Sequence, residues 1–241
     1  MATAKEHYDQ VLSDVYSWMA GGFDRGIEKN VSFFNQRDIY PGRSRRAVDL
    51  GAGCGFQSIP LAKAGFSVTA VDTDGKLLQE LADHSYQFDI KLVQDDMINF
   101  DNYVDSQVEL IVCMTDTLLH LDDRDAVATL FDKVYPALET GGKFIVTFRD
   151  LSTELSGLDR FIPVKSDDNT VLTCFLEYEP ETVKVHDIIY KKKQDEWSLS
   201  KSYYRKLRLS ADWVNDQLDR LNYAQVNSTV DNGLVTVIAT K

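Results

Sequence analysis

Cysteine, basic residues and long apolar runs are all scarce in this sequence of 241 residues. Its cysteines are Cys54, Cys113 and Cys174, which are odd in number and far apart. They lack the paired spacing of a disulfide framework or a zinc site. Isolated cysteines fit a reducing compartment, so we expect a cytoplasmic protein that holds no metal.

Basic residues are outnumbered by acidic ones, with 26 Lys and Arg against 38 Asp and Glu and a formal net charge of -12. Such a chain is repelled by phosphate backbones and by anionic lipid headgroups. The dense basic run 191–193 is followed by Asp195 and Glu196, which is typical of a solvated turn. We therefore expect no nucleic acid and no membrane among its partners.

No apolar run is long enough to span a bilayer, and residues 1–10 lack the basic start and apolar core of a secretory signal. The rest is ordinary globular composition, with 44% hydrophobic and 27% charged residues. The length suits one α/β domain over residues 1–241. The oligomeric state is left open, with a homodimer among the alternatives.

Helical periodicity fills residues 1–45, which we expect to form a helical cap. The apolar positions of the first stripe recur at spacings of three and four: Tyr8, Val11, Leu12, Val15, Tyr16 and Met19. A second helix is predicted from about Asp24 to Asp38, with Gly21-Gly22 before it and Pro41-Gly42 after it.

From residue 46 to 150, short apolar runs alternate with helical segments, which is typical of βαβ units. The predicted strands are Ala47–Leu50, Ser67–Val71, Lys91–Val93, Leu110–Met114 and Lys143–Thr147. We expect this region to be the cofactor-binding core. At its end, Arg149 and Asp150 are expected to pair with each other rather than to bind substrate.

After residue 150 the pattern changes to antiparallel strands. Residues 151–209 contain three period-two runs: Asn169–Tyr178, Val183–Tyr190 and Trp197–Arg208. Residues 210–241 contain a helix from about Ser210 to Leu221 and the strands Gln225–Val230 and Leu234–Ala239, joined by an Asn-Gly turn. We predict a three-stranded antiparallel insertion, followed by a final helix and hairpin.

A glycine loop follows the first predicted strand, in the order Asp49-Leu50-Gly51-Ala52-Gly53-Cys54-Gly55. Glycines let the backbone approach a ligand where a Cβ would collide. A dinucleotide-binding loop needs its third glycine one position later, where Phe56 stands, and Asp49 would repel a pyrophosphate. The loop favours a ligand with cationic groups over a nicotinamide dinucleotide.

Acidic residues end the next two predicted strands. Asp72, followed by Thr73, lies about 20 residues after the loop, where a carboxylate commonly accepts hydrogen bonds from ribose hydroxyls. Asp96, followed by Met97, is placed to accept a hydrogen bond from an adenine amino group. Helix capping and a solvated turn are the alternative explanations for these acids.

The segment after the fourth predicted strand should face the reacting end of a bound ligand, because ligands of open α/β sheets lie beyond the carboxyl ends of the strands. Met114 and Thr115 begin it, and His120 ends it. A histidine that titrates near neutral pH could take a proton from an amine nucleophile. The alternative for His120 is a helix-start residue satisfied by the backbone.

In this order, the glycine loop, Asp72, Asp96 and the final hairpin resemble class I S-adenosylmethionine-dependent methyltransferases. The resemblance implies a doubly wound, Rossmann-like, seven-stranded sheet, S-adenosyl-L-methionine as the cofactor and a small-molecule substrate. The residues that it implies for cofactor binding are Asp49, Gly51, Ala52, Gly53, Asp72, Thr73, Asp96, Met97, Met114 and Thr115.

Tyr8, the His120-Leu121 pair and the insertion further resemble amino-sugar N,N-dimethyltransferases and, more loosely, glycine N-methyltransferase. That likeness implies that Tyr8 positions an acceptor amine and that His120 acts as a base or orients the amine. Thr117-Leu118-Leu119 departs from the Ser-Ile-Gly that tends to precede this histidine. Left open are O-methylation, a non-catalytic module that binds the cofactor and, with lower weight, a nicotinamide oxidoreductase.

Overall fold

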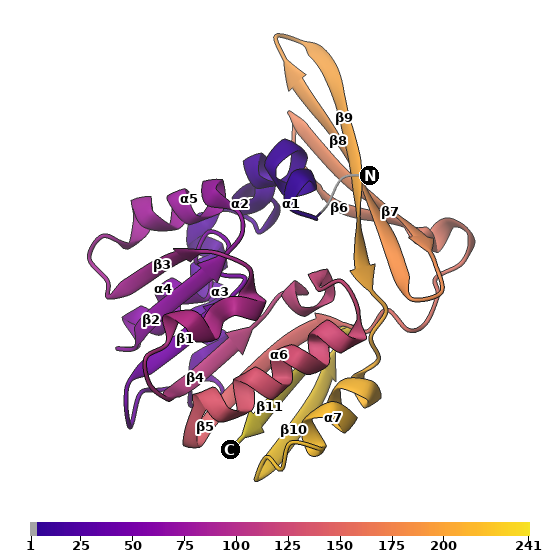
Figure 1. The fold of residues 1–241 in the computed structure, drawn as a ribbon. Helices are drawn as coiled ribbons and strands as arrows, with labels where there is room; N and C mark the ends of the chain where they lie inside the picture. The colour runs from indigo at the N-terminus through magenta and orange to yellow at the C-terminus, as the bar shows by residue number, and fades with distance from the viewer. Residues whose placement is uncertain (1–3) are drawn as a thin grey trace.

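The computed structural model describes residues 4–241, which form two β-sheets with helices around the larger one (Figure 1). The strands of the larger sheet are β1 (Arg46–Leu50), β2 (Ser67–Asp72), β3 (Ile90–Gln94), β4 (Val108–Cys113), β5 (Leu138–Arg149), β10 (Gln225–Asp231) and β11 (Leu234–Thr240). Their order across the sheet is β10-β11-β5-β4-β1-β2-β3. Only β11 runs antiparallel to its neighbours β5 and β10. The predicted fold class is confirmed.

Helices cover both faces of this sheet. The main helices are α3 (Phe23–Asn35), α4 (Ser58–Lys63), α5 (Gly75–Ser85), α6 (Arg124–Ala137) and α7 (Ala211–Asp219). On one face, Phe34 of α3 and Leu61 of α4 pack in a buried cluster, and on the other Phe131 of α6 packs against Phe144. Among residues 4–241, none of the helices combines the length and apolarity needed to cross a bilayer.

Short 3-10 turns lie at the connections: η3 (Met97–Tyr103), η4 (Thr117–His120) and η5 (Gly157–Arg160). Both η3 and η4 begin shortly after a strand of the larger sheet ends, so they stand at its carboxyl edge. Asp96 caps η3 by accepting a hydrogen bond from the backbone amide of Ile98 at 2.9 Å. This hydrogen bond fixes where η3 begins after β3.

The insertion is a separate antiparallel sheet with four strands, where the sequence indicated three. They are β6 (Phe161–Ser166), β7 (Thr170–Tyr178), β8 (Thr182–Lys193) and β9 (Glu196–Leu207). The strand that was not predicted, β6, lies at an edge, contains Pro163 and shifts register between Pro163 and Lys165. Proline is tolerated only at such edges, and it hides the alternating pattern.

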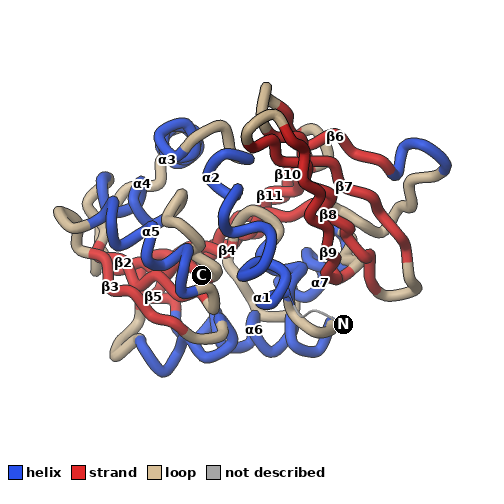
Figure 2. Tube along the Cα trace, turned by 90° about the horizontal axis from the view of Figure 1, so that it is seen from above, coloured by secondary structure: helices blue, strands red, loops and turns tan. Residues whose placement is uncertain are grey.

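The N-terminal segment lies between the two sheets (Figure 2). It contains α1 (Ala4–His7), the π-helix η1 (Tyr8–Leu12), the 3-10 turn η2 (Ser13–Val15) and α2 (Tyr16–Met19). The expected apolar stripe is therefore split into short pieces. Ser13 lies at the break, with its hydroxyl 3.0 Å from the Tyr8 carbonyl and donating to the Asp74 carboxylate at 2.5 Å.

Hydrogen bonds fasten this segment to both sides. On the side of α5, the Ser17 hydroxyl bonds the Glu80 carboxylate. On the side of the insertion, the Trp18 indole donates to Asp167 at 2.6 Å, and the Lys165 ammonium donates to the Trp18 carbonyl. Residues 4–19 consequently bridge the two sheets above the carboxyl ends of the parallel strands.

Candidate functional site

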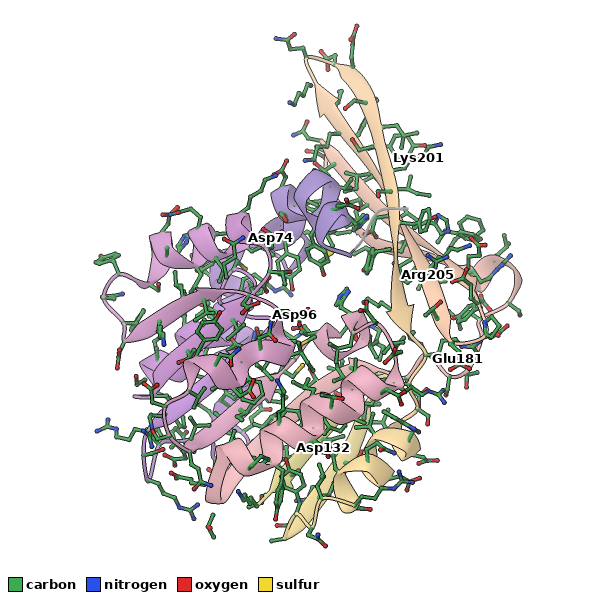
Figure 3. All side chains as sticks on the ribbon, viewed as in Figure 1. Asp74, Asp96, Asp132, Glu181, Lys201 and Arg205 are labelled. Atoms are coloured by element: carbon green, nitrogen blue, oxygen red, sulfur yellow. The ribbon has the colours of Figure 1, made fainter. Side chains whose placement is uncertain are left out.

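A cavity of about 330 Å³ opens at the carboxyl ends of β1 to β4, within the size range of small-molecule sites. Its lining includes predicted site residues from the core and the cap: Tyr8, Gly51, Gly53, Asp72, Thr73, Asp96, Met97, Thr115 and His120. In Figure 3, Asp74 and Asp96 mark the side of the larger sheet that borders it. The fold thus brings together residues from successive strand ends.

Two glycines of the loop are required by close contacts. Gly51 has a φ of +70°, and a Cβ on it would lie 2.2 Å from Cγ2 of Thr117 in η4. Gly55 has a φ of +92°, and its Cβ would lie 2.2 Å from Cδ1 of Leu81 in α5. Gly51 therefore allows η4 to approach the cavity, while Gly55 serves the packing of α5.

Asp72 is held in place by main-chain donors. Its carboxylate accepts hydrogen bonds from the amide of Gly53 at 2.7 Å and from the amide of Asp74 at 2.8 Å. Burial raises the pKa of Asp72, and these amides oppose that rise. Because each carboxylate oxygen has a second lone pair, the group can still accept hydrogen bonds from a ligand in the cavity.

Asp95 and Asp96, which follow β3, have different surroundings. Asp95 is occupied within the fold, since it accepts hydrogen bonds from Tyr103 at 2.6 Å and from Asn99 at 3.0 Å. Asp96 lines the cavity together with Met97 and the adjacent Ile98. Of these two acids, Asp96 is the one that lines the cavity.

Three residues expected to bind the cofactor lie behind the cavity wall: Asp49, Ala52 and Met114. Alternation along β1 turns Asp49 toward α4, where it accepts a hydrogen bond from the Ser58 hydroxyl at 2.6 Å. Burial raises the pKa of Asp49 to about 7. Met114 packs in the same buried cluster as Phe34. These side chains support the wall without forming it.

The pairing expected between Arg149 and Asp150 is wrong. Arg149 forms an ion pair with Asp116, which also accepts a hydrogen bond from Lys206 of β9 at 2.8 Å. Asp150 instead accepts hydrogen bonds from Ser152 and from the amide of Ala211. Asp116 has a left-handed φ of 69° and lies directly before η4.

Two cations on one carboxylate strongly favour its ionised form. Lys206 and Arg149 hold the pKa of Asp116 far below its usual value, although burial opposes them. The side chain of Asp116 is only 3% exposed. This network joins the insertion to the segment that begins η4, and therefore fixes where His120 lies relative to β9.

At one end of the cavity, aromatic rings gather from three distant parts of the chain. The ring of His120 stacks on Tyr204 of β9, with centroids 5.3 Å apart and planes 23° apart. Tyr8 meets His120 edge-on at 5.7 Å and Tyr204 at 6.1 Å. Tyr8 and His120 line the cavity, whereas Tyr204 supports them from behind.

His120 does not titrate near neutral pH, in contrast to the expectation from its side-chain type. Burial, the nearby Lys206 and His7 lower its pKa to about 3, and Asp116 opposes this only in part. Its Nδ1 is buried and has no hydrogen-bond partner among the described residues. This neutral imidazole can accept a hydrogen bond, but its lowered pKa makes it a weak base.

Several lining residues escaped the sequence analysis. Within the core they are Asp74, Leu77, Ile98, Thr117, Leu121 and Asp122, and in the cap there is Tyr16. Most of them are next to predicted residues, so their proximity in sequence could have suggested them. The aromatic residues of β9 indicated that the insertion could cover the acceptor, but the period-two pattern does not reveal that Tyr204 is the one that reaches the core.

The charged side chains in the lining are the carboxylates Asp72, Asp74, Asp96 and Asp122. Within the described chain, no lysine or arginine lines the cavity. A pyrophosphate would be repelled there, whereas a sulfonium with an amino group would be attracted. Together with the volume of the cavity, the carboxylate lining fits S-adenosylmethionine and does not fit a nicotinamide dinucleotide.

Comparisons with known proteins agree with this geometry. Residues 47–142 match the family model described as "Methyltransferase domain". Glycine/sarcosine N-methyltransferase from Aphanothece halophytica is 24% identical over 109 residues, which cover 44% of this chain and 41% of that protein. The chain thus matches less than half the length of this curated relative.

Solved structures extend the likeness to the whole fold. An S-adenosylmethionine-dependent methyltransferase from Clostridium acetobutylicum superposes with a TM-score of 0.74 at 17% identity, over 94% of this chain and 98% of that one. An amino pentose methyltransferase from Micromonospora echinaspora, bound to S-adenosylmethionine, has a TM-score of 0.77 at 11% identity, over 94% and 95%. At these identities the likeness is one of fold. With the domain match, it confirms the resemblance to class I methyltransferases.

Proposed function

We propose that this chain, which carries a methyltransferase domain at residues 47–142, transfers a methyl group from S-adenosylmethionine to the nitrogen of a small amine. The observation that carries the proposal is the cavity at the strand ends, whose charged lining residues are all carboxylates and which ends at Tyr8 and His120. The sugar and glycine N-methyltransferases among the similar proteins support nitrogen as the acceptor atom.

The residues of the core would hold the cofactor. Asp72 has lone pairs for the ribose hydroxyls, because its main-chain donors use one side of each oxygen. Asp96, Met97 and Ile98 would contact the adenine, and Gly51 and Thr115 would lie along the methionine portion. When bound, S-adenosylmethionine supplies an activated methyl group: its S–C bond breaks as a C–N bond forms, and the nitrogen loses a proton.

His120 and Tyr8 would orient the amine. A neutral imidazole accepts a hydrogen bond from an N–H and thereby aims the nitrogen lone pair at the methyl group. Because the pKa of His120 is lowered to about 3, this ring does not take the proton, which stays on the methylated nitrogen until the product reaches solvent. The amine therefore has to arrive uncharged, which makes the reaction faster as the pH rises toward the pKa of the amine.

The N-terminal segment would close the site against water. Tyr8 and Tyr16 from this segment line the cavity, and hydrogen bonds to α5 and to the insertion hold the segment over it. Exclusion of water strengthens the electrostatic contacts within the site and keeps the reactants in line. Alignment and exclusion of water are the main contributions that a protein makes to methyl transfer.

A transfer assay tests the proposal. The purified chain is mixed with methyl-labelled S-adenosylmethionine and panels of small amines, hydroxyl compounds and carboxylic acids, and the label is followed into the acceptor. The proposal expects labelled amine and adenosylhomocysteine in equal amounts. Label only on oxygen, tight cofactor binding without turnover on any acceptor, or no cofactor binding would each contradict it.

A further inference from the structure

His7, next to Tyr8, is buried in a contact that the proposed reaction leaves unexplained. Its Nε2 lies 2.8 Å from Oδ2 of Asp187, a residue of β8 that is 180 positions away in sequence. Both side chains are almost without exposure, at 0% and 3%. Hydrogen bonds between buried polar groups are costly to break, because the separated groups cannot regain water.

Each oxygen of Asp187 has one hydrogen-bond partner. Its second oxygen, Oδ1, accepts a hydrogen bond from the thiol of Cys174 in β7 at 2.7 Å. Among the described residues, no lysine or arginine pairs with Asp187. His7 is therefore the nitrogen donor on which this buried carboxylate depends, and Asp187 fixes one edge of the imidazole.

The other contacts of His7 lead to the acceptor end of the cavity. The His7 ring packs on Tyr204 with centroids 4.5 Å apart, and Tyr204 in turn stacks on His120 at 5.3 Å. Tyr204 thus contacts two imidazoles, one bonded to Asp187 and one lining the cavity. Along the chain, His7 is also directly followed by Tyr8, which lines the cavity.

We propose that His7, fixed by its hydrogen bond to Asp187, is a positioning residue for the acceptor: it sets the plane of Tyr204 and the place of Tyr8, and through them the orientation of His120. This inference rests on the proposed methyl transfer. Since neither His7 nor Asp187 lines the cavity, both act only through the rings between them and the acceptor. The pair sets how the amine lies, and it leaves the cofactor contacts of Asp72 and Asp96 unchanged.

Matched substitutions separate this role from simple packing. His7→Phe keeps a ring against Tyr204 but removes the donor to Asp187. His7→Gln restores a donor at about the position of Nε2. Asp187→Asn weakens the same bond from the sheet side and serves if His7→Phe fails to fold. His84→Phe, on the exposed surface of α5, is the control for the same chemical change elsewhere.

Turnover gives the first readout. We expect His7→Phe to lower kcat/KM for the amine on the order of tenfold to a hundredfold, as small misplacements of reacting groups do. The dissociation constant of S-adenosylmethionine should stay within about threefold, which separates this effect from the loss of a cofactor contact. His7→Gln should recover most of the activity, and His84→Phe should match the unaltered protein.

A second readout does not need turnover. The chain has 4 histidines, so the Cε1–H signal of His120 can be followed by NMR, and its stacking on Tyr204 displaces that signal. The signal should move in His7→Phe and return in His7→Gln. Unchanged kcat/KM and an unchanged signal in His7→Phe, or equal losses in the Phe and Gln variants, would overturn the inference. If the unaltered protein methylates nothing while the signal still moves, the proposed function fails and the positioning role stands.

Discussion

The two ends of the cavity are built in different ways. At the end proposed for the cofactor, called the cofactor end below, the wall consists of turns that directly follow β1, β2 and β3. Its acid Asp72 is oriented by the main-chain amides of Gly53 and Asp74. At the end proposed for the acceptor, called the acceptor end below, Tyr8, His120 and Tyr204 come from three distant segments and are oriented by ring contacts, edge-on for Tyr8 and stacked for His120 and Tyr204. The first end depends on local geometry, and the second depends on how the cap and the insertion dock.

This contrast also separates the chemistry. The cofactor end carries carboxylates and attracts a cation. The acceptor end consists of neutral rings, with Lys206 and Arg149 held behind it on Asp116. Substitutions at one end should therefore change cofactor affinity, and substitutions at the other should change turnover of the acceptor.

The largest effect is expected at Gly51. In Gly51→Ala, the new methyl group would stand 2.2 Å from Thr117 on a backbone with a φ of +70°. The loop or Thr117 must shift, and both line the cavity, so we expect the affinity for S-adenosylmethionine to fall by roughly a hundredfold or more, about 3 kcal/mol. Isothermal titration calorimetry measures the dissociation constant of S-adenosylmethionine for each variant.

Gly157→Ala is the matched control, because Gly157 also has a positive φ, of +55°, but nothing lies within 4 Å of the added Cβ. It should cost about 1 kcal/mol of unfolding free energy through backbone strain and leave cofactor affinity unchanged. Equal cofactor affinities in the two variants would show that the loop does not need to approach the ligand closely.

Asp72→Asn should have the next largest effect. An amide group at this position points a donor at the amide of Gly53 or Asp74, so one of these buried donors loses its acceptor. We expect cofactor affinity to fall by about 2 kcal/mol, or roughly thirtyfold. Asp105→Asn, at an exposed position before β4, is the control. An unchanged dissociation constant in Asp72→Asn would exclude this carboxylate as a ligand contact.

His120→Ala should act on turnover instead. We expect kcat to fall on the order of tenfold, about 1.4 kcal/mol, with the dissociation constant of the cofactor within about twofold. A pH series from 5 to 9 gives the sharper result. Because the pKa of His120 is lowered to about 3, the ring stays neutral throughout, and the rate should rise only with deprotonation of the amine.

A pH limb near 6.5 that disappears in His120→Ala would contradict the orienting role and favour a general base. The same lowered pKa also has a consequence for stability. As the pH falls from about 6.5 toward 3, the unfolded chain takes up the proton first, so His120 makes the folded state less stable in that range. In urea unfolding, His120→Ala should lose less unfolding free energy than the unaltered protein between about pH 6.5 and 3.

The smallest effect is expected from removing single hydroxyl groups. Tyr8→Phe should raise KM for the amine about threefold and leave cofactor affinity unchanged, since Tyr8 meets His120 edge-on at the acceptor end. Tyr16→Phe is its counterpart, because the Tyr16 ring lies 3.8 Å from a Cβ built on Gly53 and so belongs to the cofactor end. Steady-state kinetics with each substrate varied in turn separate them. The comparison fails if both variants change the same constant.

The contrast explains what the sequence could predict. The strands of the larger sheet and the placement of Asp72 and Asp96 followed from local patterns, because alternation and turns are set by neighbouring residues. The four-stranded insertion was only partly predicted, since Pro163 hides β6. Contacts between distant segments, such as Arg149 with Asp116 or His7 with Asp187, depend on docking and left no local trace.

Asp49 and His120 illustrate the same limit. Asp49 has the residue type expected of a ligand contact, but the alternation of β1 turns it to Ser58. His120 has the expected place, but burial and Lys206 change its pKa. In both cases the chemistry of the side chain depends on surroundings that the motif does not contain.

The central claim is that carboxylates at successive strand ends select a cationic nucleoside that carries no phosphate. The most direct test is calorimetric titration of the full chain with S-adenosylmethionine and, separately, with NAD. The account predicts one molecule of S-adenosylmethionine bound per chain and no heat from NAD. Binding of NAD in the same cavity, with S-adenosylmethionine unable to displace it, would contradict the account.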